Sequence, residues 1–402
     1  MRSHLEPGRN LPLRLDTAKT PFHPRTSDAN TLNLWHQWKG VTVSEVYDDE
    51  ELEYFALRNS CGVFDVSPLQ KYRVSGPDAQ AYLNRLVTRD ISKLKEGRVT
   101  YVAWCNDAGK VLDDGTLFHI EPGVYRLCSY ERHFSWLKAS TLGFDVEVVE
   151  ESNSVAGLAV QGPTSCAVLK DLGLQDIELM KPFELRWFQL NGVPLMCSRT
   201  GFIGDLGYEL WIEPDHALML WDTLFEAGRL RGIRPVGTQA YEMARIEAGF
   251  LQAGVDFLSA AYIVRQGRAR SPFELGLDWL VNFDKPHFNG RQALLREQQQ
   301  GSTWRLLKLD VEGNKPATHA YIYAGTSKQI GFVTSAVWSP ICKANLALAT
   351  VKQPFGQSTD DLHAEIYYQK ELHWSRVMAP CTPVDGAFWN PARRRATPPA
   401  DF

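Results

Sequence analysis

The sequence has no long hydrophobic run and no excess of positive charge. None of its apolar stretches approaches the roughly 18 residues that a membrane-spanning helix needs, and the first twenty residues are too polar for a signal-peptide core. With 43 Lys and Arg against 47 Asp and Glu, the net charge is −4, which offers no basic surface for a phosphate backbone. We therefore expect a cytoplasmic protein that binds neither membranes nor nucleic acid.

Motifs that identify common catalytic sites are also missing. The sequence contains no G-x-S-x-G elbow, no phosphate-binding G-x-x-x-x-G-K-[ST] loop, no G-x-G-x-x-G and no H-E-x-x-H. Its seven cysteines include no C-x-x-C pair and its ten histidines no H-x-x-x-H pair. We therefore expect buried free thiols and no bound metal. Any chemistry must come from acids, tyrosines and arginines.

What is present is the composition of an ordinary folded protein with more than one domain. Hydrophobic residues make up 44% and charged residues 22% of the 402 residues, a length that exceeds what one core usually accommodates. Helical and strand periodicities alternate over 20–299, and 300–388 holds short β-type segments typical of a small barrel. We expect an α+β fold with a flexible extension at 1–19. At 389–402 we expect a tail whose three consecutive arginines form a solvated end.

A hairpin is predicted where two strand-like segments, Arg98–Cys105 and Val111–Ile120, flank a run of turn-forming residues. Neighbouring side chains on a strand point to opposite faces, so Asp113 and Asp114 cannot both enter one cavity. Taken alone, this pair is most simply two surface carboxylates. Helical periodicity is expected at about 237–250.

Nine short motifs occur in the order in which the glycine cleavage T-protein family carries similar ones. Each is weak alone, but together they extend over much of the chain, and on them the sequence resembles this family. The motifs are CGVFDVS (61–67), VSGPDA (74–79), CNDAGKVLDD (105–114), VQGP (160–163), RTGFIGDLGYEL (199–210), ARIEAGF (244–250), SPFELGLDW (271–279), FNGRQAL (288–294) and GFVTSAVWSP (331–340).

The resemblance implies a ring of two α/β domains and a C-terminal β-barrel, with tetrahydrofolate in the central hole. Asp114 matches the family's active aspartate, which would accept a proton from the pterin nitrogen that receives the one-carbon unit. Glu209 matches a glutamate that accepts hydrogen bonds from the pterin, a role that suits an acceptor-only side chain. Tyr101 matches a tyrosine of the folate pocket, although a tyrosine in an apolar strand is equally compatible with the core.

Two further matches lie near the folate and the interface with the third domain, Trp279 and Arg291. Trp279 stands in an apolar segment, where a tryptophan is more often simply part of the core. Both residues are kept as candidates for cofactor binding.

Departures from the family pattern gather on its substrate side. Phe202 replaces the tyrosine of RTGYTGE, Pro68 replaces a histidine, and Tyr241 stands where the family has an arginine. An asparagine-rich stretch is replaced by one that ends at Ser129. We therefore expect the folate site to be retained, with Phe202 and Ser129 among its residues, and the aminomethyl substrate to be altered.

In its D-D-G motif and in Tyr241 the sequence resembles the tetrahydrofolate-dependent aryl O-demethylases. This resemblance implies that Tyr241 acts as a proton donor or as a phenol that orients the substrate. Tyr241 could also be an ordinary tyrosine of the helix. The first hypothesis is a demethylase that moves a methyl group from a small O-, S- or N-methylated metabolite to tetrahydrofolate. The second is an aminomethyltransferase whose partner is a lipoylated carrier protein. The third is a non-catalytic folate-binding protein, although the K-G-C-x-x-G-Q-E motif of that class is absent.

Overall fold

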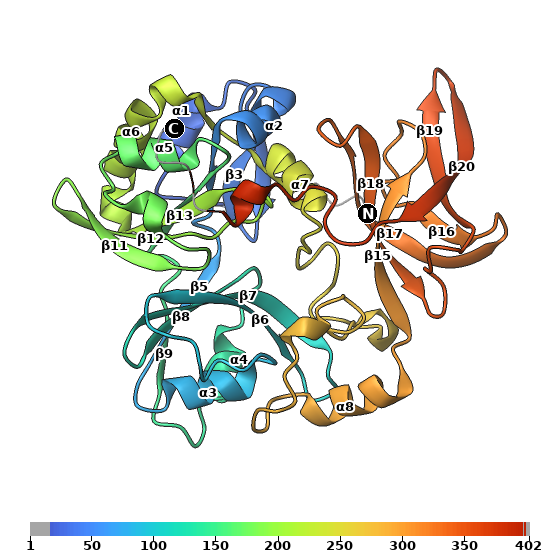
Figure 1. Cartoon of the computed structure of the whole chain (residues 1–402), viewed down its shortest axis with the longest axis horizontal. Coiled ribbons are helices and arrows are strands. Elements are labelled where there is room, and N and C mark those ends of the chain that lie inside the picture. The colour runs from blue at the N-terminus through green and yellow to red at the C-terminus, as the bar shows by residue number, and fades with distance from the viewer. Residues whose placement is uncertain (1–16, 397, 399–402) are drawn as a thin grey trace, which may run out of the picture.

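The computed structural model describes residues 17–396 and residue 398, and most of the expected 1–19 extension therefore lies outside the described residues. The chain folds into three lobes arranged around the middle of the molecule (Figure 1). Two lobes are built on open sheets with helices, and the third is a closed barrel, which confirms the α+β class and the expected ring of two α/β domains and a barrel.

The first lobe contains a six-stranded sheet in the order β11-β12-β13-β10-β4-β14. Its strands are β4 (Cys61–Asp65), β10 (Ala156–Gln161), β11 (Leu185–Leu190), β12 (Val193–Ser198), β13 (Gly207–Ile212) and β14 (Ile233–Pro235). Its helices are α1 (His23–Ala29), α2 (Glu50–Asn59), α5 (Ser165–Asp171), α6 (Ala217–Ala227) and α7 (Thr238–Glu247), the last inside the predicted helical stretch. Every residue of β4, β10 and β13 is buried, because both faces of these strands are covered.

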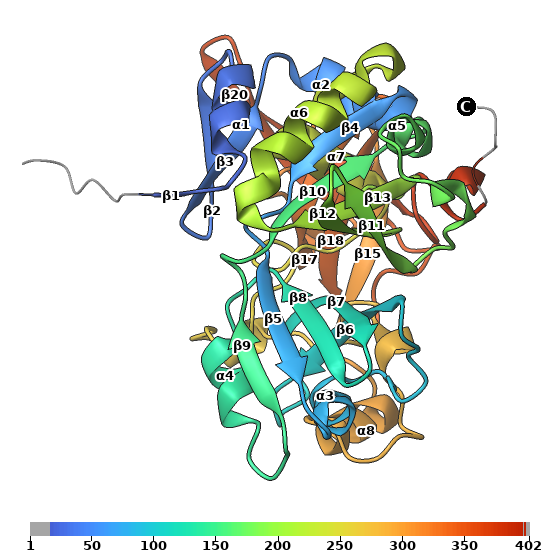
Figure 2. The same ribbon diagram turned by 90° about the vertical axis from the view of Figure 1, so that its left-hand side faces the viewer.

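A small three-stranded sheet stands beside this lobe, with the order β1-β3-β2 (Figure 2). It comprises β1 (Ala18–Lys19), β2 (Leu34–Trp38) and β3 (Val41–Val46). The end of the expected extension is therefore paired, since Ala18 and Lys19 align in parallel with Val41 and Thr42.

The second lobe has a five-stranded sheet in the order β6-β7-β8-β5-β9, with α3 and α4 below it in Figure 1. Its elements are β5 (Gln70–Ser75), α3 (Ala79–Leu86), β6 (Arg98–Cys105), β7 (Val111–Glu121), β8 (Val124–Ser129), α4 (Phe134–Ala139) and β9 (Glu147–Glu150). The chain thus leaves the first lobe after β4, builds the second, and returns at β10. The predicted hairpin is confirmed as β6 and β7, in which Ala103 pairs with Asp114. A later segment with α8 (Arg291–Gln300) leads on toward the barrel.

The third lobe is a closed barrel in the order β15-β18-β17-β16-β19-β20. Its strands are β15 (Trp304–Val311), β16 (Tyr321–Ala324), β17 (Lys328–Ser339), β18 (Ala344–Lys352), β19 (Leu362–Lys370) and β20 (His373–Pro383). Its core consists of small and branched residues such as Leu309, Ile322 and Ala349, which fit a narrow interior.

The C-terminal segment corrects the expectation of a solvated arginine end. After β20 the chain returns to the first lobe, where a short turn of helix at Ala392–Arg394 forms. The Arg393 guanidinium donates to both carboxylate oxygens of Asp205, at 2.6 and 2.8 Å. Charge complementarity with a fully buried aspartate side chain, which sequence position alone does not reveal, orders this part of the tail.

All seven cysteines lie in the described part of the chain and are free, and six of them are buried. None of the helices in the described ranges is long and apolar enough to cross a membrane. The same ranges contain no cluster of three or more His, Cys, Asp or Glu side chains arranged to hold a metal ion.

Candidate active site

A cavity of about 1550 Å³ lies where the three lobes meet. It is lined by the first lobe and its loops, by β6 to β8 of the second lobe, by the start of β15 and by the C-terminal segment. Seven of the eight candidate site residues line it, namely Tyr101, Asp114, Ser129, Phe202, Glu209, Tyr241 and Trp279.

Arg291 is not brought into this cavity. It begins α8, where its guanidinium donates to the Phe283 carbonyl at 2.9 Å and lies 6.0 Å from the Phe283 ring. The cavity therefore gives no support to the prediction that Arg291 contacts the cofactor, which stays a prediction; the contacts seen are those of a residue that fixes the segment before α8.

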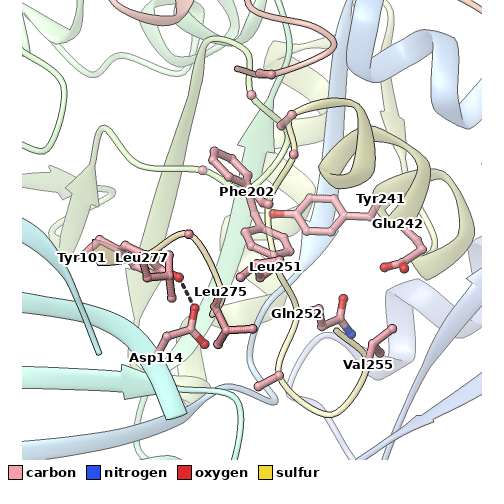
Figure 3. Close-up of a pocket in the computed structure, with 18 of the residues that line it drawn as sticks. Tyr101, Asp114, Phe202, Tyr241, Glu242, Leu251, Gln252, Val255, Leu275 and Leu277 are labelled. Atoms are coloured by element: carbon pink, nitrogen blue, oxygen red, sulfur yellow. Dashed lines mark hydrogen bonds between the residues drawn. The ribbon is translucent and has the colours of Figure 1, made fainter. Parts of the chain in front are cut away.

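Asp113 and Asp114 point to opposite faces of β7, as strand geometry requires. Asp113 is fully buried and accepts hydrogen bonds from the Glu131 amide at 2.8 Å and from His133 Nε2 at 3.1 Å. Asp114 faces the cavity instead, where the Tyr101 hydroxyl donates to its Oδ2 (Figure 3). Only Asp114 can therefore meet a bound ligand.

The glycine of the D-D-G motif, Gly115, is required by the close approach of β7 and β8. Gly115 pairs with Ser129 on β8, and a Cβ atom at this position would lie 1.9 Å from the Cys128 carbonyl oxygen. Only glycine allows the two strands to approach so closely beside the cavity. Ser129 is buried at this contact, and its hydroxyl donates to the Glu131 carbonyl at 2.8 Å.

The surroundings of Asp114 raise its pKa above that of a free aspartate, so the carboxyl group keeps its proton to higher pH. Burial, and then the nearby charge of Asp113, raises the pKa of Asp114 to about 8, against the smaller opposing effect of the Tyr101 hydrogen bond. A carboxyl group with this pKa titrates close to neutrality, in the range where general bases operate best.

This pKa predicts the pH dependence of the reaction. If ionised Asp114 is the base, kcat/KM should rise with pH and reach half of its plateau near pH 8, because the raised pKa leaves the group mostly protonated below that value. Asp113→Asn should move the midpoint to lower pH, since it removes the second cause of the shift. Initial rates from pH 6 to 10 would measure both. A midpoint that does not move in Asp113→Asn would contradict the coupling of the two carboxyl groups.

Glu209 lies on β13 and supplies a second acid to the cavity. It is 9% exposed, and its Oε2 accepts a hydrogen bond from Thr200 Oγ1 at 2.6 Å. Burial raises its pKa to about 6, while the Thr200 hydroxyl and Ser198 favour the ionised form. At neutral pH Glu209 is thus a buried anion, suited to accept hydrogen bonds from N–H donors of a ligand.

Tyr101 and Trp279 form one aromatic side of the cavity. Their ring centroids are 6.0 Å apart with an interplanar angle of 28°, and the Arg89 guanidinium lies 5.5 Å from the Trp279 ring. Trp279 is 59% exposed, so the alternative in which it is a core residue is wrong.

The opposite side is formed by the predicted Tyr241 and by three aromatic residues that sequence reasoning missed, Trp38, Phe64 and Tyr130. Tyr241 stacks on Phe64 with centroids 4.1 Å apart and an interplanar angle of 11°, and Phe64 in turn lies 6.0 Å from Trp38. Tyr130 completes the group, 5.6 Å from Trp38. We call Trp38, Phe64, Tyr130 and Tyr241 the aromatic wall. All four line the cavity. They come from four separate parts of the chain, namely β2, β4, the residue after β8, and α7, so no sequence spacing relates them.

Phe202 extends the aromatic wall toward the C-terminal segment (Figure 3). Its ring is 6.2 Å from Tyr241 and 5.5 Å from Phe250. Burial and the negative charge of Glu209 raise the pKa of the Tyr241 phenol far above its usual value, so this hydroxyl keeps its proton.

Three lobes close around a cavity lined by buried acids and aromatic rings, an arrangement suited to an enzyme's active site. The comparison with known proteins then identifies the family: the model of the GCVT N-terminal domain matches residues 30–285, and that of the glycine cleavage T-protein C-terminal barrel domain matches residues 305–382. The chain belongs to the glycine cleavage T-protein family, as its motifs indicated, and is an enzyme.

Curated relatives include aminomethyltransferases and a trimethylamine-oxide aldolase. An aminomethyltransferase of Caldanaerobacter subterraneus is 33% identical over 310 residues, which cover 76% of this chain and 80% of the relative. An aminomethyltransferase of Halothermothrix orenii is 34% identical over 304 residues, 75% of this chain and 82% of that protein. Trimethylamine-oxide aldolase of Ruegeria pomeroyi is 34% identical over 399 residues, covering 94% of this chain but 48% of the relative.

A solved structure supports the fold alone. The glycine cleavage system aminomethyltransferase T from Bartonella henselae matches with a TM-score of 0.80 at 22% identity, covering 95% of this chain and 99% of that one.

Proposed function

We propose that this enzyme moves a methyl group from a small O-, S- or N-methylated metabolite to tetrahydrofolate, and that a methylated cation is the best-fitting donor. The observation that carries the proposal is the aromatic wall, which stands in the same cavity as Asp114, Glu209, Glu45 and Glu242. Aromatic faces and carboxylates together attract a methylated ammonium or sulfonium group. The similarity to trimethylamine-oxide aldolase, which extends over almost the whole chain, agrees with a nitrogen-bound donor.

The residues present fit tetrahydrofolate as the acceptor. The cavity of about 1550 Å³ is large enough for it, and buried Glu209 offers the acceptor that the N–H edge of a pterin requires. When bound, tetrahydrofolate supplies the nucleophilic nitrogen that takes up the one-carbon unit. This chain's residues would hold that nitrogen near Asp114 and shield it from water with the Tyr101 and Trp279 rings.

The chain's own role in the chemistry is to place the donor and to remove a proton. The methyl carbon would form a bond to the acceptor nitrogen as its bond to the donor's nitrogen or sulfur breaks, and the electron pair of the broken bond would stay on the donor, which would leave neutral. The Asp114 carboxylate, whose pKa of about 8 suits this role, would accept the proton that the acceptor nitrogen gives up. Tyr101 holds Asp114 in place through its hydroxyl.

A panel of methyl donors tests this function. Purified protein and tetrahydrofolate would be incubated with a quaternary ammonium compound, a tertiary amine oxide, a sulfonium compound and an aryl methyl ether, and methyl-tetrahydrofolate would be measured. Tetrahydrofolate should also raise the melting temperature, because it would bind only the folded ring. Absence of any thermal shift at saturating tetrahydrofolate would remove the basis of the proposal.

The second candidate function is aminomethyl transfer from a lipoylated carrier protein. It is favoured by the aminomethyltransferase relatives, which match about three quarters of this chain. This function requires ammonia release that depends on the carrier, with methylene-tetrahydrofolate as product. Robust carrier-dependent ammonia release would replace the demethylase proposal.

Tyr241→Phe separates the donor types. A sulfonium or quaternary ammonium donor leaves neutral and needs no acid, so the variant should retain kcat/KM within about threefold, because the ring still stacks on Phe64. An ether donor, whose oxygen leaves as an anion, should lose about a hundredfold or more. Steady-state rates with both donor types would decide. A large loss with a cationic donor would show that the phenol itself takes part in that reaction.

A further inference from the structure

The Asp113 carboxylate, which faces away from the cavity, accepts three hydrogen bonds. Its Oδ1 accepts from the Asp114 amide at 2.9 Å, and its Oδ2 accepts from the Glu131 amide at 2.8 Å and from His133 Nε2 at 3.1 Å. An ionised carboxylate is an acceptor at both oxygens, whereas protonation turns one oxygen into a donor that would meet these N–H groups. The three donors therefore favour the ionised form of Asp113, against the cost of burying its charge.

One of these three donors is a side chain. The other two are backbone amides, which are present whatever residues stand there. His133 precedes α4, and its imidazole is 3% exposed. The ring lies edge-on to Trp104 with centroids 5.6 Å apart and an interplanar angle of 86°, and the His133 amide donates to the Tyr72 hydroxyl at 2.7 Å. Ring and backbone are thus both held, and His133 is the donor that a substitution can remove.

The charge of Asp113 acts in turn on Asp114. The two carboxyl groups belong to adjacent residues and are both buried, so their charges interact with little screening by water. Burial, and then the charge of Asp113, raises the pKa of Asp114. Burial also raises the pKa of Asp113, and the hydrogen bond from His133 is the largest opposing cause. His133 therefore opposes protonation of Asp113, and ionised Asp113 opposes ionisation of Asp114.

The charged and titratable groups packed around this cluster are Tyr101 of β6, Tyr72 of β5, Glu131 and Arg132 after β8, Glu150 of β9 and Lys39 after β2. Burial raises the pKa of both phenols, which keep their protons at neutral pH. The other four form two ion pairs, Lys39 with Glu131 and Arg132 with Glu150, each at 2.6 Å. Their charges cancel within each pair, so among the described residues it is His133 that biases Asp113.

We propose that His133 is a positioning residue of the reaction: by holding Asp113 ionised, it determines the pH above which Asp114 can act as the base. This inference rests on the proposed function, in which Asp114 accepts a proton. His133 does not line the cavity. Its effect passes through one hydrogen bond to Asp113 and from there, as charge, to the group that meets the ligand.

Loss of the His133 donor should change which aspartate keeps a proton. Two buried carboxyl groups so close together do not both ionise readily, so one proton stays with the pair near neutrality. With His133 in place that proton stays on Asp114. Without the donor, burial favours the protonated form of Asp113, and Asp114 should then ionise at lower pH.

The experiment follows the carboxyl carbon of Asp114 by NMR, from pH 5 to 10, in the full-length protein with isotope-labelled aspartate. The signal is identified by its loss in Asp114→Asn. His133→Phe keeps a ring against Trp104 but has no donor, and the titration midpoint should fall by about one pH unit. His133→Gln retains an N–H donor within reach of Asp113 and should stay within about 0.3 unit of wild type. The midpoint of kcat/KM should move in the same direction.

Two controls make the test specific. In Asp113→Asn the midpoint should already be low, and adding His133→Phe should move it by less than about 0.2 unit, because the path through Asp113 is gone. His119→Phe makes the same substitution elsewhere on β7, where the ring contacts the Leu94 carbonyl at 2.8 Å and stacks on Tyr125. This variant should leave the midpoint unchanged.

A midpoint that stays or rises in His133→Phe overturns the inference, and so does a shift that persists in the Asp113→Asn background. A lower melting temperature without a shift assigns His133 a structural role alone and overturns it as well. His133→Leu carries the same prediction should the phenylalanine variant not fold. A shifted titration with no turnover of any donor confirms the coupling and removes the proposed function alone, whereas turnover with an unshifted titration leaves the proposed function and removes the inference.

Discussion

Asp114→Asn should lower kcat by about a hundredfold or more, the usual effect of removing a positioned proton acceptor. The amide has nearly the shape of the carboxyl group and can still accept a hydrogen bond from the Tyr101 hydroxyl, so the cavity should keep its form. An amide cannot take up the proton that the acceptor nitrogen loses. Steady-state rates combined with the Kd of tetrahydrofolate would measure the effect, and the Kd should change by less than about threefold.

Asp113→Asn is the matched control, since it makes the same chemical change one residue away on the opposite face of β7. It should shift the pH profile and reduce stability, because Asp113 accepts bonds from buried His133 and from the Glu131 amide. At the pH optimum of each protein its kcat should remain within about tenfold of wild type. Equal losses in the two variants, or a larger loss in Asp113→Asn, would contradict the assignment of Asp114 as the base.

The local structure of the second lobe was predictable because it depends on neighbouring residues. Alternation along Arg98–Cys105 and the turn composition of 106–110 specified the hairpin, and its strands fixed which aspartate faces the cavity. Barrel strands were recognisable for the same reason, since each is a short β-type segment bounded by turn residues. The pairing of distant strands was not predictable from such signals. β4, for example, pairs with β10 and β14, which both lie far from it in the sequence.

The residues of the candidate site likewise include some that the sequence indicated and others that only the fold brings together. Asp114 and Glu209 stand in motifs that resemble a known family, Tyr101 matches a position of that family, and the structure brings all three to one cavity. Trp38 stands outside the motifs and Phe64 inside one that suggests no role for it; their rings, 6.0 Å apart, come from two different sheets. Arg394 was taken for part of a solvated end, because the buried aspartate that anchors its neighbour is nearly two hundred residues away in sequence. Charge on a tail is informative only once the surface that it meets is known.

Arg58→Met should destabilise the fold by about 3–5 kcal/mol, the usual cost of breaking a buried ion network from one side. Arg58 of α2 donates to Glu247 of α7 at 2.6 and 2.8 Å and to the carbonyls of Ile203 and Ala244, and its side chain is fully buried. Methionine fills part of the volume but leaves the Glu247 carboxylate without its cation. The barrel would also be affected, because the Ser339 hydroxyl of β17 donates to Glu247.

Denaturant unfolding would measure this loss, with Arg25→Met as control. Arg25 pairs with Asp222 at 2.6 Å, but its side chain is 37% exposed and that of Asp222 50%, so this variant should lose far less stability than Arg58→Met. Because the first lobe and the barrel share the Arg58 network, its loss should lower the unfolding midpoint seen by probes in both lobes. It should also loosen the C-terminal segment, since the Trp389 amide binds the Glu247 carbonyl and its ring lies 5.9 Å from the Arg58 guanidinium. Equal effects of Arg58→Met and Arg25→Met would show that the buried network contributes no more than a surface pair, and that the lobes are held together by apolar packing alone.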